Sequence, residues 1–381
     1  MITCQWEWMK TLFTLRTLSP KSDMEDIEQV WCALAPYESE SYFLSWGWVQ
    51  TWLRMLPLGT NLKLAVHFDY AGPKMAFFVG NARIRRHHIL TSNAFYLNET
   101  GDPEYDQLFI EHNCVVARSD AKVDILEVLS ALPPNWEELY LSGLRAESPL
   151  LLLPAPYTLR RLRQSPSPFV ELDRVRKVGD YVTLLSSSTR SQIRRSYRLY
   201  AEEFGEVELD VAESESQAER FFAELVELHQ RRWEQKGAAG AFANRFFHDF
   251  HRSLIHNRFE TGEIQLLRVR AGRTTIGCLY NFVLGGVVYF YQSGFNYAGD
   301  NRLKPGFVTH TEAVRFNAAH GKQIYDFMGG SARYKNSLAT SSRELVWAVI
   351  SKPKIKFSVE NWLREWKRKC RVYLDRTRAR S

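Results

Sequence analysis

The chain is 381 residues long, with an apolar share of 45% and five scattered cysteines. That length predicts two domains rather than one core. The odd cysteine number and the lack of CxxC spacing argue against a disulfide framework or a zinc site and favour a reducing compartment. No apolar run approaches the roughly 18 residues of a membrane span, and Glu7 and Lys10 interrupt the segment where a secretory signal would be uncharged, so we expect a cytoplasmic protein.

The net charge of +7 is concentrated at the C-terminal end. Residues 352–381 carry eleven Lys and Arg against three acidic residues, a balance of +8, which leaves the other 351 residues at −1. Trp362, Leu363 and Trp366 lie among apolar residues at helical spacing, so we predict an amphipathic helix with a basic face. Three partners are open for it: its own domain, an anionic surface such as the inner membrane or an envelope assembly, and nucleic acid.

The first half reads as alternating helices and strands. Strands are predicted from β-branched and aromatic runs, and helices from apolar residues at helical spacing. The expected elements are a strand at 12–18, helices at 23–34 and 46–55, strands at 62–68, 75–80 and 87–91, a helix at about 105–117, and a strand at 139–142. Four prolines between 154 and 168 then indicate a boundary. We therefore divide the chain into domains at 1–165 and 166–350, with a basic tail at 351–381.

The second half opens with serines at 186–188, which are candidate helix caps. They precede a helix with arginines at 190, 194, 195 and 198, which reads as a solvated basic face or as a site for a phosphate, an acidic sugar or tRNA. The elements expected next are a strand at 207–211, helices at 217–235 and 242–255, strands at 263–270, 274–284 and 287–292, a helix from Pro305 to about 320, and a strand at 324–328. This alternation predicts an α/β fold.

The start of the helix at Pro305 is the first candidate site. A polar loop leads from the strand at 287–292 to Lys304, and Pro305-Gly306 then opens the helix. Unpaired backbone N–H groups and the positive end of the helix dipole suit an anion there, most usefully a diphosphate. Lys304 would offset phosphate charge directly.

Three motifs in this order resemble the CelD/BcsL-type acetyltransferases, a branch of the GNAT superfamily related to the FemAB-like aminoacyltransferases. They are the run Leu228–Trp233 with a glycine after it, Lys304–Gly306 opening a helix, and Tyr325–Gly329 before Tyr334 and Lys335. The resemblance is best from about residue 187 to 349 and looser in the N-terminal half. It implies a mixed α/β sheet in tandem GNAT-like domains, the C-terminal one better preserved.

The resemblance also implies a donor, acetyl-CoA or another acyl-CoA, with no metal. Such enzymes hold the pantetheine arm between two splayed parallel strands and the pyrophosphate at the start of the following helix. The positions that match this role are Tyr291, Gln292, Lys304, Pro305, Gly306 and Phe307. The chain departs from the family's Gln/Arg-x-x-Gly-x-Gly/Ala loop, because Asn301 and Lys304 fill the first two places and only Gly306 is kept.

Three residues are the candidate catalytic groups. Asp326 would accept a proton from the amine, directly or through water, although a carboxylate at a strand end also commonly caps backbone N–H groups. Tyr334 would donate a proton to the leaving thiolate, with Tyr289 and Tyr291 as competitors for that role. Lys335 would either pair with Asp326 or hold an anionic group of the substrate.

The acceptor pocket is assigned to the helix after residue 217. His229 and Arg232 would line it, Trp233 would be its floor, and Gly237–Gly240 would be a mobile lip over it. Tyr289 is included as a wall residue. The alternatives are a buried histidine without a ligand and a tyrosine that only fills the core.

The expected reaction is acyl transfer to a primary amine, such as an amino sugar or a polysaccharide precursor. Two alternatives stay open. One is a FemAB-like transferase that takes its donor from aminoacyl-tRNA, which basic segments would bind. The other is a non-catalytic GNAT-like scaffold in envelope polysaccharide assembly. No HExxH, CxxC or GxSxG motif occurs, which gives metal-dependent and serine hydrolase functions no support.

Overall fold

The computed structural model describes residues 13–17, 23–34, 41–86, 90–297 and 299–364, with side chains from residue 23 on. The elements of the first half are β1 Phe13–Thr17, α1 Met24–Leu34, α2 Trp46–Met55, β2 Leu62–Asp69, β3 Gly72–Arg86, β4 Leu90–Leu97, β5 Val116–Ala117, α3 Ile125–Ala131, β6 Glu138–Arg145 and β7 Thr158–Glu171.

The second half continues the alternation and confirms the α/β class. Its elements are α4 Leu172–Val178, α5 Ser187–Glu203, β8 Val207–Val211, α6 Glu215–Glu234, α7 Arg245–Arg258, β9 Ile264–Ala271, β10 Thr274–Leu284, β11 Val287–Phe295, α8 Pro305–Ala319, β12 Ile324–Asp326, α9 Arg333–Leu338 and β13 Ser341–Ser351. A last helix covers 355–364. No helix in the described ranges is long and apolar enough to cross a membrane.

The strands form one 13-stranded mixed sheet that runs through both halves in the order β1-β2-β3-β4-β6-β13-β7-β12-β11-β10-β9-β8, with β5 beside β3. Each half repeats one pattern: a strand, two helices, three antiparallel strands, and a strand parallel to the third of them. In the first half these are β1, α1–α2, β2–β3–β4 and β6. In the second half they are β8, α6–α7, β9–β10–β11 and β12, as the expected tandem arrangement requires.

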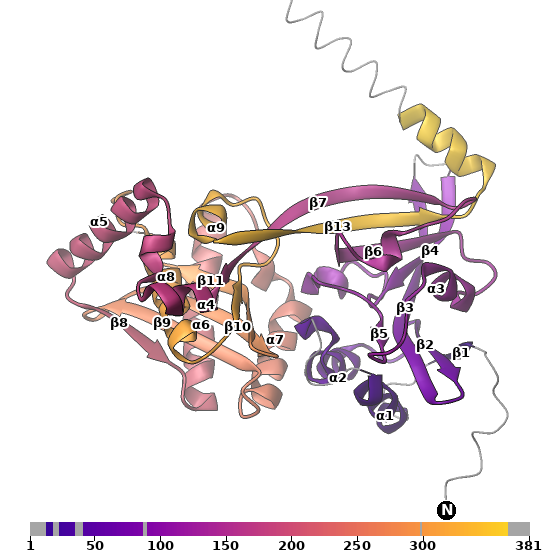
Figure 1. Ribbon diagram of the computed structural model, residues 1–381, viewed down its shortest axis with the longest axis horizontal. Coiled ribbons are helices and arrows are strands. Elements are labelled where there is room, and N and C mark those ends of the chain that lie inside the picture. The colour runs from indigo at the N-terminus through magenta and orange to yellow at the C-terminus, as the bar shows by residue number, and fades with distance from the viewer. Residues whose placement is uncertain (1–12, 18–22, 35–40, 87–89, 298, 365–381) are drawn as a thin grey trace, which may run out of the picture.

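The two halves exchange their last strands. β7 leaves the first half and pairs with β12, while β13 leaves the second half and pairs with β6, and the two long strands pair with each other (Figure 1). The proline-rich stretch is therefore a strand, where the sequence suggested only a boundary, and position 165/166 lies inside it. Its prolines lack N–H groups but still accept: Phe327 N–H donates to Pro168 O at 2.9 Å and Gly330 N–H to Pro166 O at 3.1 Å.

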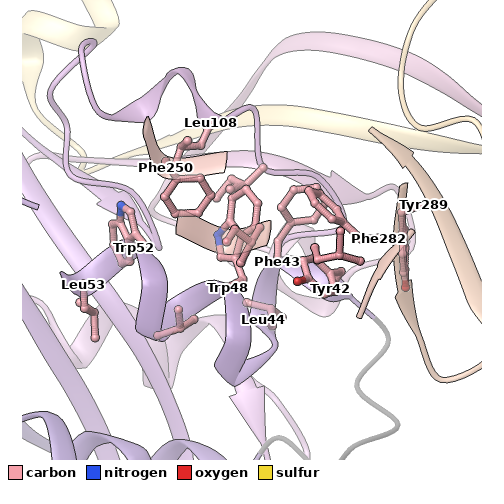
Figure 2. Close-up of a cluster of buried hydrophobic side chains, with 14 of the residues drawn as sticks. Tyr42, Phe43, Leu44, Trp48, Trp52, Leu53, Leu108, Phe250, Phe282 and Tyr289 are labelled. Carbon is pink, nitrogen blue, oxygen red and sulfur yellow. The ribbon is translucent and has the colours of Figure 1, made fainter. Parts of the chain in front are cut away.

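A hydrophobic core shared by the two halves lies between α2 and α7. Figure 2 shows its aromatic side chains, with Tyr42 stacked on Phe282 at 4.3 Å and Trp48 edge-on to Phe250 at 4.8 Å between ring centroids. Tyr42 and Trp48 come from the first half, Phe250 and Phe282 from the second. Because all four are buried, neither half can leave the other without exposing this cluster to water.

The helix expected at about 105–117 is absent. The described chain there has a 3-10 helix over Asp106–Leu108, and Phe109 and His112 then take left-handed backbone conformations, with φ of 49° and 51°. An α-helix cannot include such residues. Contacts from the second half set this path instead, because Tyr291 Oη–H donates to Leu108 O at 2.5 Å and Gly329 N–H donates to Glu111 Oε2 at 2.5 Å.

Other local expectations agree with the structure. The helix at 46–55 is confirmed at both ends, and Ser186 caps α5 by accepting from Thr189 N–H. The strand expected at 87–91 lies partly outside the described residues, and β4 begins at Leu90. The predicted basic helix is described only as far as residue 364, so most of its cationic residues lie outside the described ranges.

Candidate functional site

The parallel strands β11 and β12 separate soon after they meet. They pair only from Val287↔Ile324 to Tyr289↔Asp326, after which β12 ends and β11 continues to Phe295. A β-bulge lies at the same place: Tyr280 pairs with Gln292 and the next residue, Asn281, pairs with Phe290, so Tyr291 is the additional residue of β11. The edge of β11 beyond residue 289 is thus turned away from β12, as the splayed-strand expectation requires.

A cavity of about 400 Å³ opens where β11 ends. Its walls come from the last turns of α6, from the loop after β11, from the start of α8 and from α9. Four predicted donor residues, Lys304–Phe307, line it together with Arg232 and Tyr334. The structure therefore brings one candidate catalytic residue and one candidate acceptor residue to the predicted donor site.

The start of α8 faces this cavity without a side-chain cap from the described residues. Pro305 occupies the first turn, and Lys304 N–H donates to Ser196 Oγ of α5 at 3.0 Å. Gly306 does not have a left-handed backbone, and an added Cβ would meet only the Phe295 ring, at 3.5 Å. The fold does not need a glycine there, and its missing side chain leaves the first turn open to a ligand.

Cationic side chains surround the cavity mouth. The Arg232 guanidinium lies over the Tyr297 ring at 4.2 Å, and Lys304 precedes the helix. The pKa of Asp300 is lowered, first by Arg302, which is 2.6 Å away, and also by the charge of Arg195 on α5. The arginine helix thus reaches the same mouth, where its charge adds to that of Lys304 and Arg232.

Tyr334 is partly buried at the cavity wall, and its ring stacks on the His310 ring at 5.5 Å and 18°. Burial, and then the neighbouring Tyr297, raise the pKa of Tyr334, so its hydroxyl keeps its proton at neutral pH. Burial, and after it the charge of Lys335, lower the pKa of His310 to about 3, so the stacking partner is neutral. A protonated hydroxyl is what donation to a leaving thiolate needs.

Lys335 binds carbonyl oxygens instead of a carboxylate. Its Nζ donates to Phe327 O at 2.7 Å and to Gly329 O at 2.9 Å. Burial lowers its pKa, while the charges of Glu111 and Asp326 oppose that shift. Lys335 therefore holds the loop after β12 in place.

Asp326 is fully buried at the end of β12. Its Oδ1 accepts from Met328 N–H at 2.8 Å and from Ser167 Oγ–H at 3.0 Å, and its Oδ2 lies 3.3 Å from His112 Nε2. Burial works against the charge, but His112, the Met328 N–H and Arg343 outweigh it and lower the pKa of Asp326. The carboxylate caps a backbone N–H and faces the first half, and its lowered pKa makes it a weak base.

The first half supplies residues around Asp326 that the sequence analysis did not select. Arg145 Nε–H donates to His112 Nδ1 at 3.4 Å, so Nδ1 is the acceptor and Nε2 carries the hydrogen that faces Asp326. Glu111 accepts from Gly329 N–H, and burial raises its pKa despite that bond. No local signal could have found these residues, because their role depends on a loop path that the second half imposes.

His229 lies on α6 beside the free end of β11. Its Nδ1 is 3.2 Å from Ser293 O, and since a carbonyl can only accept, Nδ1 carries the hydrogen. Its Nε2 is buried and has no hydrogen-bond partner among the described residues. Burial lowers the pKa of His229, so the ring is neutral and Nε2 keeps an unused lone pair.

The remaining predicted residues lie around this end of the sheet. Tyr289 and Tyr291 face the core shared by the two halves, and Tyr291 Oη bonds to Leu108 O and His251. Gln292 is half-buried on β11, and Trp233 is 37% exposed on α6. Gln230 Nε2–H donates to Ala239 O at 2.7 Å, which holds the loop Gly237–Gly240 against α6.

A larger cavity, of about 650 Å³, lies in the first half and is lined by His112, Cys114, Arg118 and Arg145 among others. It contains no start of a long helix, so it lacks the set of N–H groups that suits a diphosphate. In the described part of the chain no three His, Cys, Asp or Glu side chains group as metal ligands.

Comparison with known proteins finds one family model. Residues 187–336 match the model of an acetyltransferase (GNAT) domain. No curated protein sequence matches the chain. The matched range includes α6, β11, α8 and Tyr334, which contribute residues to the cavity, and also β12.

Solved structures resemble the whole chain in fold. A conserved protein of unknown function from Bacteroides thetaiotaomicron is 10% identical, with 90% of this chain and 100% of that chain covered and a TM-score of 0.53. FemX is 8% identical, with 87% and 97% covered and a TM-score of 0.51. A tandem GNAT protein from the clavulanic acid biosynthesis pathway is 10% identical, with 90% and 100% covered and a TM-score of 0.47. At such identities the first two similarities concern the fold alone.

Proposed function

We propose that this GNAT-domain protein is an acyl-CoA-dependent N-acyltransferase that uses acetyl-CoA or a longer acyl-CoA. One observation carries the proposal: the open start of α8 and Tyr334 line a single cavity where β11 ends, beyond its separation from β12. The acceptor is an amine, with an amino sugar or a polysaccharide precursor of the CelD/BcsL kind as the proposed class.

The donor binds with its diphosphate at the first turn of α8. Backbone N–H groups and the helix dipole attract the anion, and Lys304 and Arg232 neutralise its remaining charge. The pantetheine arm follows the edge of β11 beyond Tyr289, where backbone groups face away from β12. Arg195 stands near Asp300 at the mouth, within reach of a further phosphate.

The chemical step forms one C–N bond and breaks one C–S bond. The neutral amine attacks the thioester carbonyl, the tetrahedral intermediate expels the thiolate, and Tyr334 protonates that thiolate. The proton lost by the amine goes to a base at the free end of β11. Most of the acceleration comes from holding the two reactants together.

We assign that base to His229 and give Asp326 a positioning role. His229 bonds through Nδ1 to Ser293 O of β11, the strand that would carry the thioester, and its Nε2 has an unused lone pair. Asp326, in contrast, accepts through Oδ1 from Ser167 and Met328, and its Oδ2 faces His112 of the first half. Arg232 and Trp233, one turn further along α6, then border the acceptor.

Calorimetric titration with acetyl-CoA and a longer acyl-CoA tests the donor site, with Gly306→Trp and Gly306→Ala as a matched pair. A Cβ at this position meets only ordinary contact, so the alanine variant keeps both fold and binding, whereas an indole fills the first turn and abolishes binding. If the wild-type protein binds neither thioester, the acyl-CoA proposal is wrong.

A tRNA-dependent transferase is the second candidate, and the exposed Arg194, Arg195 and Arg198 on α5 favour it. Filter binding with tRNA over a series of salt concentrations separates the two donors. Steeply salt-dependent tRNA binding without CoA binding would select it. A protein that binds CoA but transfers no acyl group to any amine would point to the scaffold alternative.

A further inference from the structure

The helix at 355–364 is attached to the sheet by one side only. Phe357 and Glu360 are 4% and 5% exposed. Glu360 pairs with Arg86 of β3 at 3.1 Å and with Arg364 on its own helix. Figure 1 shows this helix beyond the end of the β7–β13 ribbon, at the edge of the first half. Its orientation is therefore fixed by a buried ion pair and one aromatic anchor.

The other side of this helix is an exposed apolar stripe. Ile355, Val359, Trp362 and Leu363 are 85%, 50%, 64% and 42% exposed. Their spacing of four, three and one residues puts them on one helix face, away from Phe357 and Glu360. Single exposed apolar residues are ordinary, but a contiguous stripe of large ones marks an interaction surface. The helix does dock on its own domain, yet not through this stripe.

Exposed cationic side chains lie on the strands next to this helix. Arg83 and Arg85 at the end of β3 are exposed, and so is Arg161 on β7. Arg160 on β7 lies near enough to Arg364 for the latter's charge to lower its pKa, after burial as the larger cause. The sequence that follows, 365–381, has a balance of +5.

The acidic residues near this helix are engaged on its attached side. Glu138 binds Arg86, and Glu137 binds Lys354 and Lys356. Their charges are therefore compensated, and the exposed surface around the stripe is basic. A partner for this face must accept aliphatic and indole side chains together with positive charge.

We propose that the stripe Ile355, Val359, Trp362 and Leu363, with the exposed Arg83 and Arg85 on the adjoining strand β3, docks the protein on an anionic lipid surface. Apolar residues enter the boundary between headgroups and acyl chains, the indole sits at headgroup level, and the arginines attract acidic headgroups. This inference does not depend on the proposed acyl transfer.

Other partners fit less well. Nucleic acid needs the cations but gains nothing from Ile355 and Val359. A second copy would need about 800 Å² of surface on each partner, more than one face of a ten-residue helix offers. A lipid surface uses both the apolar and the cationic residues and needs no shape complementarity.

Vesicle sedimentation of the full chain tests the proposal. The probes are vesicles of phosphatidylcholine alone and of phosphatidylcholine mixed with phosphatidylglycerol. The stripe variant combines Ile355→Ser, Val359→Ser, Trp362→Ser and Leu363→Ser, all at exposed positions. The control, Leu58→Ser with Tyr70→Ser, removes side chains that are 72% and 103% exposed on another part of the surface.

We expect the wild-type protein and the control to sediment with the anionic vesicles and not with the neutral ones. The stripe variant should lose at least about tenfold in partitioning, since burial of each large apolar side chain contributes several-fold. Arg83→Gln with Arg85→Gln should weaken binding and reduce its salt dependence. Equal binding by the stripe variant, or no binding by the wild type, would overturn the proposal. A dimer or an RNA complex that only the stripe variant loses would assign the face to that partner instead.

Discussion

The two halves of this molecule share a topology but differ beyond the point where their two parallel strands stop pairing. In the first half β4 and β6 pair over Ala94–Tyr96, just as β11 and β12 pair over Val287–Tyr289. Beyond that point the first half closes its gap with side chains. Asn113 Nδ2–H donates to Leu97 O at 3.0 Å, and Asn98 Nδ2–H donates to Cys114 O at 2.7 Å. In the second half the corresponding edge of β11 borders a cavity.

The connections after the third antiparallel strand differ as well. The second half crosses over through α8, a helix of 15 residues that begins at the cavity, whereas the first half uses an extended loop and the seven-residue α3. The loop of the first half instead packs on the second half, through Glu111 and His112. One copy of the pattern thus provides the cavity of the candidate site, and the other contacts Asp326 and the loop after β12, which fits one donor for the whole chain.

The largest expected effect is on the rate of acyl transfer, measured separately from donor binding in the second half. His229→Gln keeps a donor for Ser293 O but removes a titratable base, so acyl transfer to an amine should fall about 10²- to 10⁴-fold. Rates over a pH series, with calorimetry of acetyl-CoA binding beside them, check this. Burial lowers the pKa of His229, so the wild-type rate should lose its base only below the ordinary histidine range. Unchanged rates with intact CoA binding would exclude His229 as the base.

Removal of an aromatic residue between the halves tests whether they are separable. Trp48→Ala should cost about 3–5 kcal/mol of unfolding free energy, because it leaves a cavity in the shared core. Phe77→Ala, in a core that the first half builds together with β13, is the control. Denaturant unfolding should show one transition for both variants. Two transitions, of which only one moves, would mean that the halves unfold independently.

The contact between Asp326 and His112 joins the two halves at the end of β12. Asp326→Asn removes a buried charge next to His112 and Arg343, and we expect a loss of about 3 kcal/mol. The lowered pKa of Asp326 gives stability that is full above the carboxylate's ordinary pKa and is lost as pH falls through the lower folded value. Acid unfolding should therefore be less steep for the variant. If the two proteins respond alike to acid, the carboxylate carries no such charge.

The smallest expected effect concerns the closed gap of the first half. Asn113→Ala removes the side-chain donor to Leu97 O and one of the hydrogen bonds of the Asn98 amide, and should cost about 1–3 kcal/mol. Thermal unfolding measures that cost. Binding of acetyl-CoA should not change, because the first half does not hold the donor. A change in CoA affinity without a change in stability would contradict the comparison between the halves.

Local signals were sufficient for most elements and for the donor side of the site. The serine cap and apolar spacing of α2, the cap of α5, and Pro305 at the start of α8 each act within a few residues. Spacing along α6 placed His229 and Arg232 on one helix, next to the strand that ends at the cavity. These predictions needed no knowledge of distant segments.

Only the tertiary structure decided the rest. Residues 105–117 left the helical path because Tyr291 and Gly329 bind them, and β7 became a strand because β12 and β13 pair with it across its prolines. Asp326 contacts His112 for the same reason, because that partner comes from a remote position in the first half. The sequence by itself determined where helices and strands begin and which one presents an open start to an anion, since those signals are local. The side-chain contacts beside β4, the cavity at the end of β11 and the contacts between the halves depend on long-range contacts, which leave no pattern in the sequence.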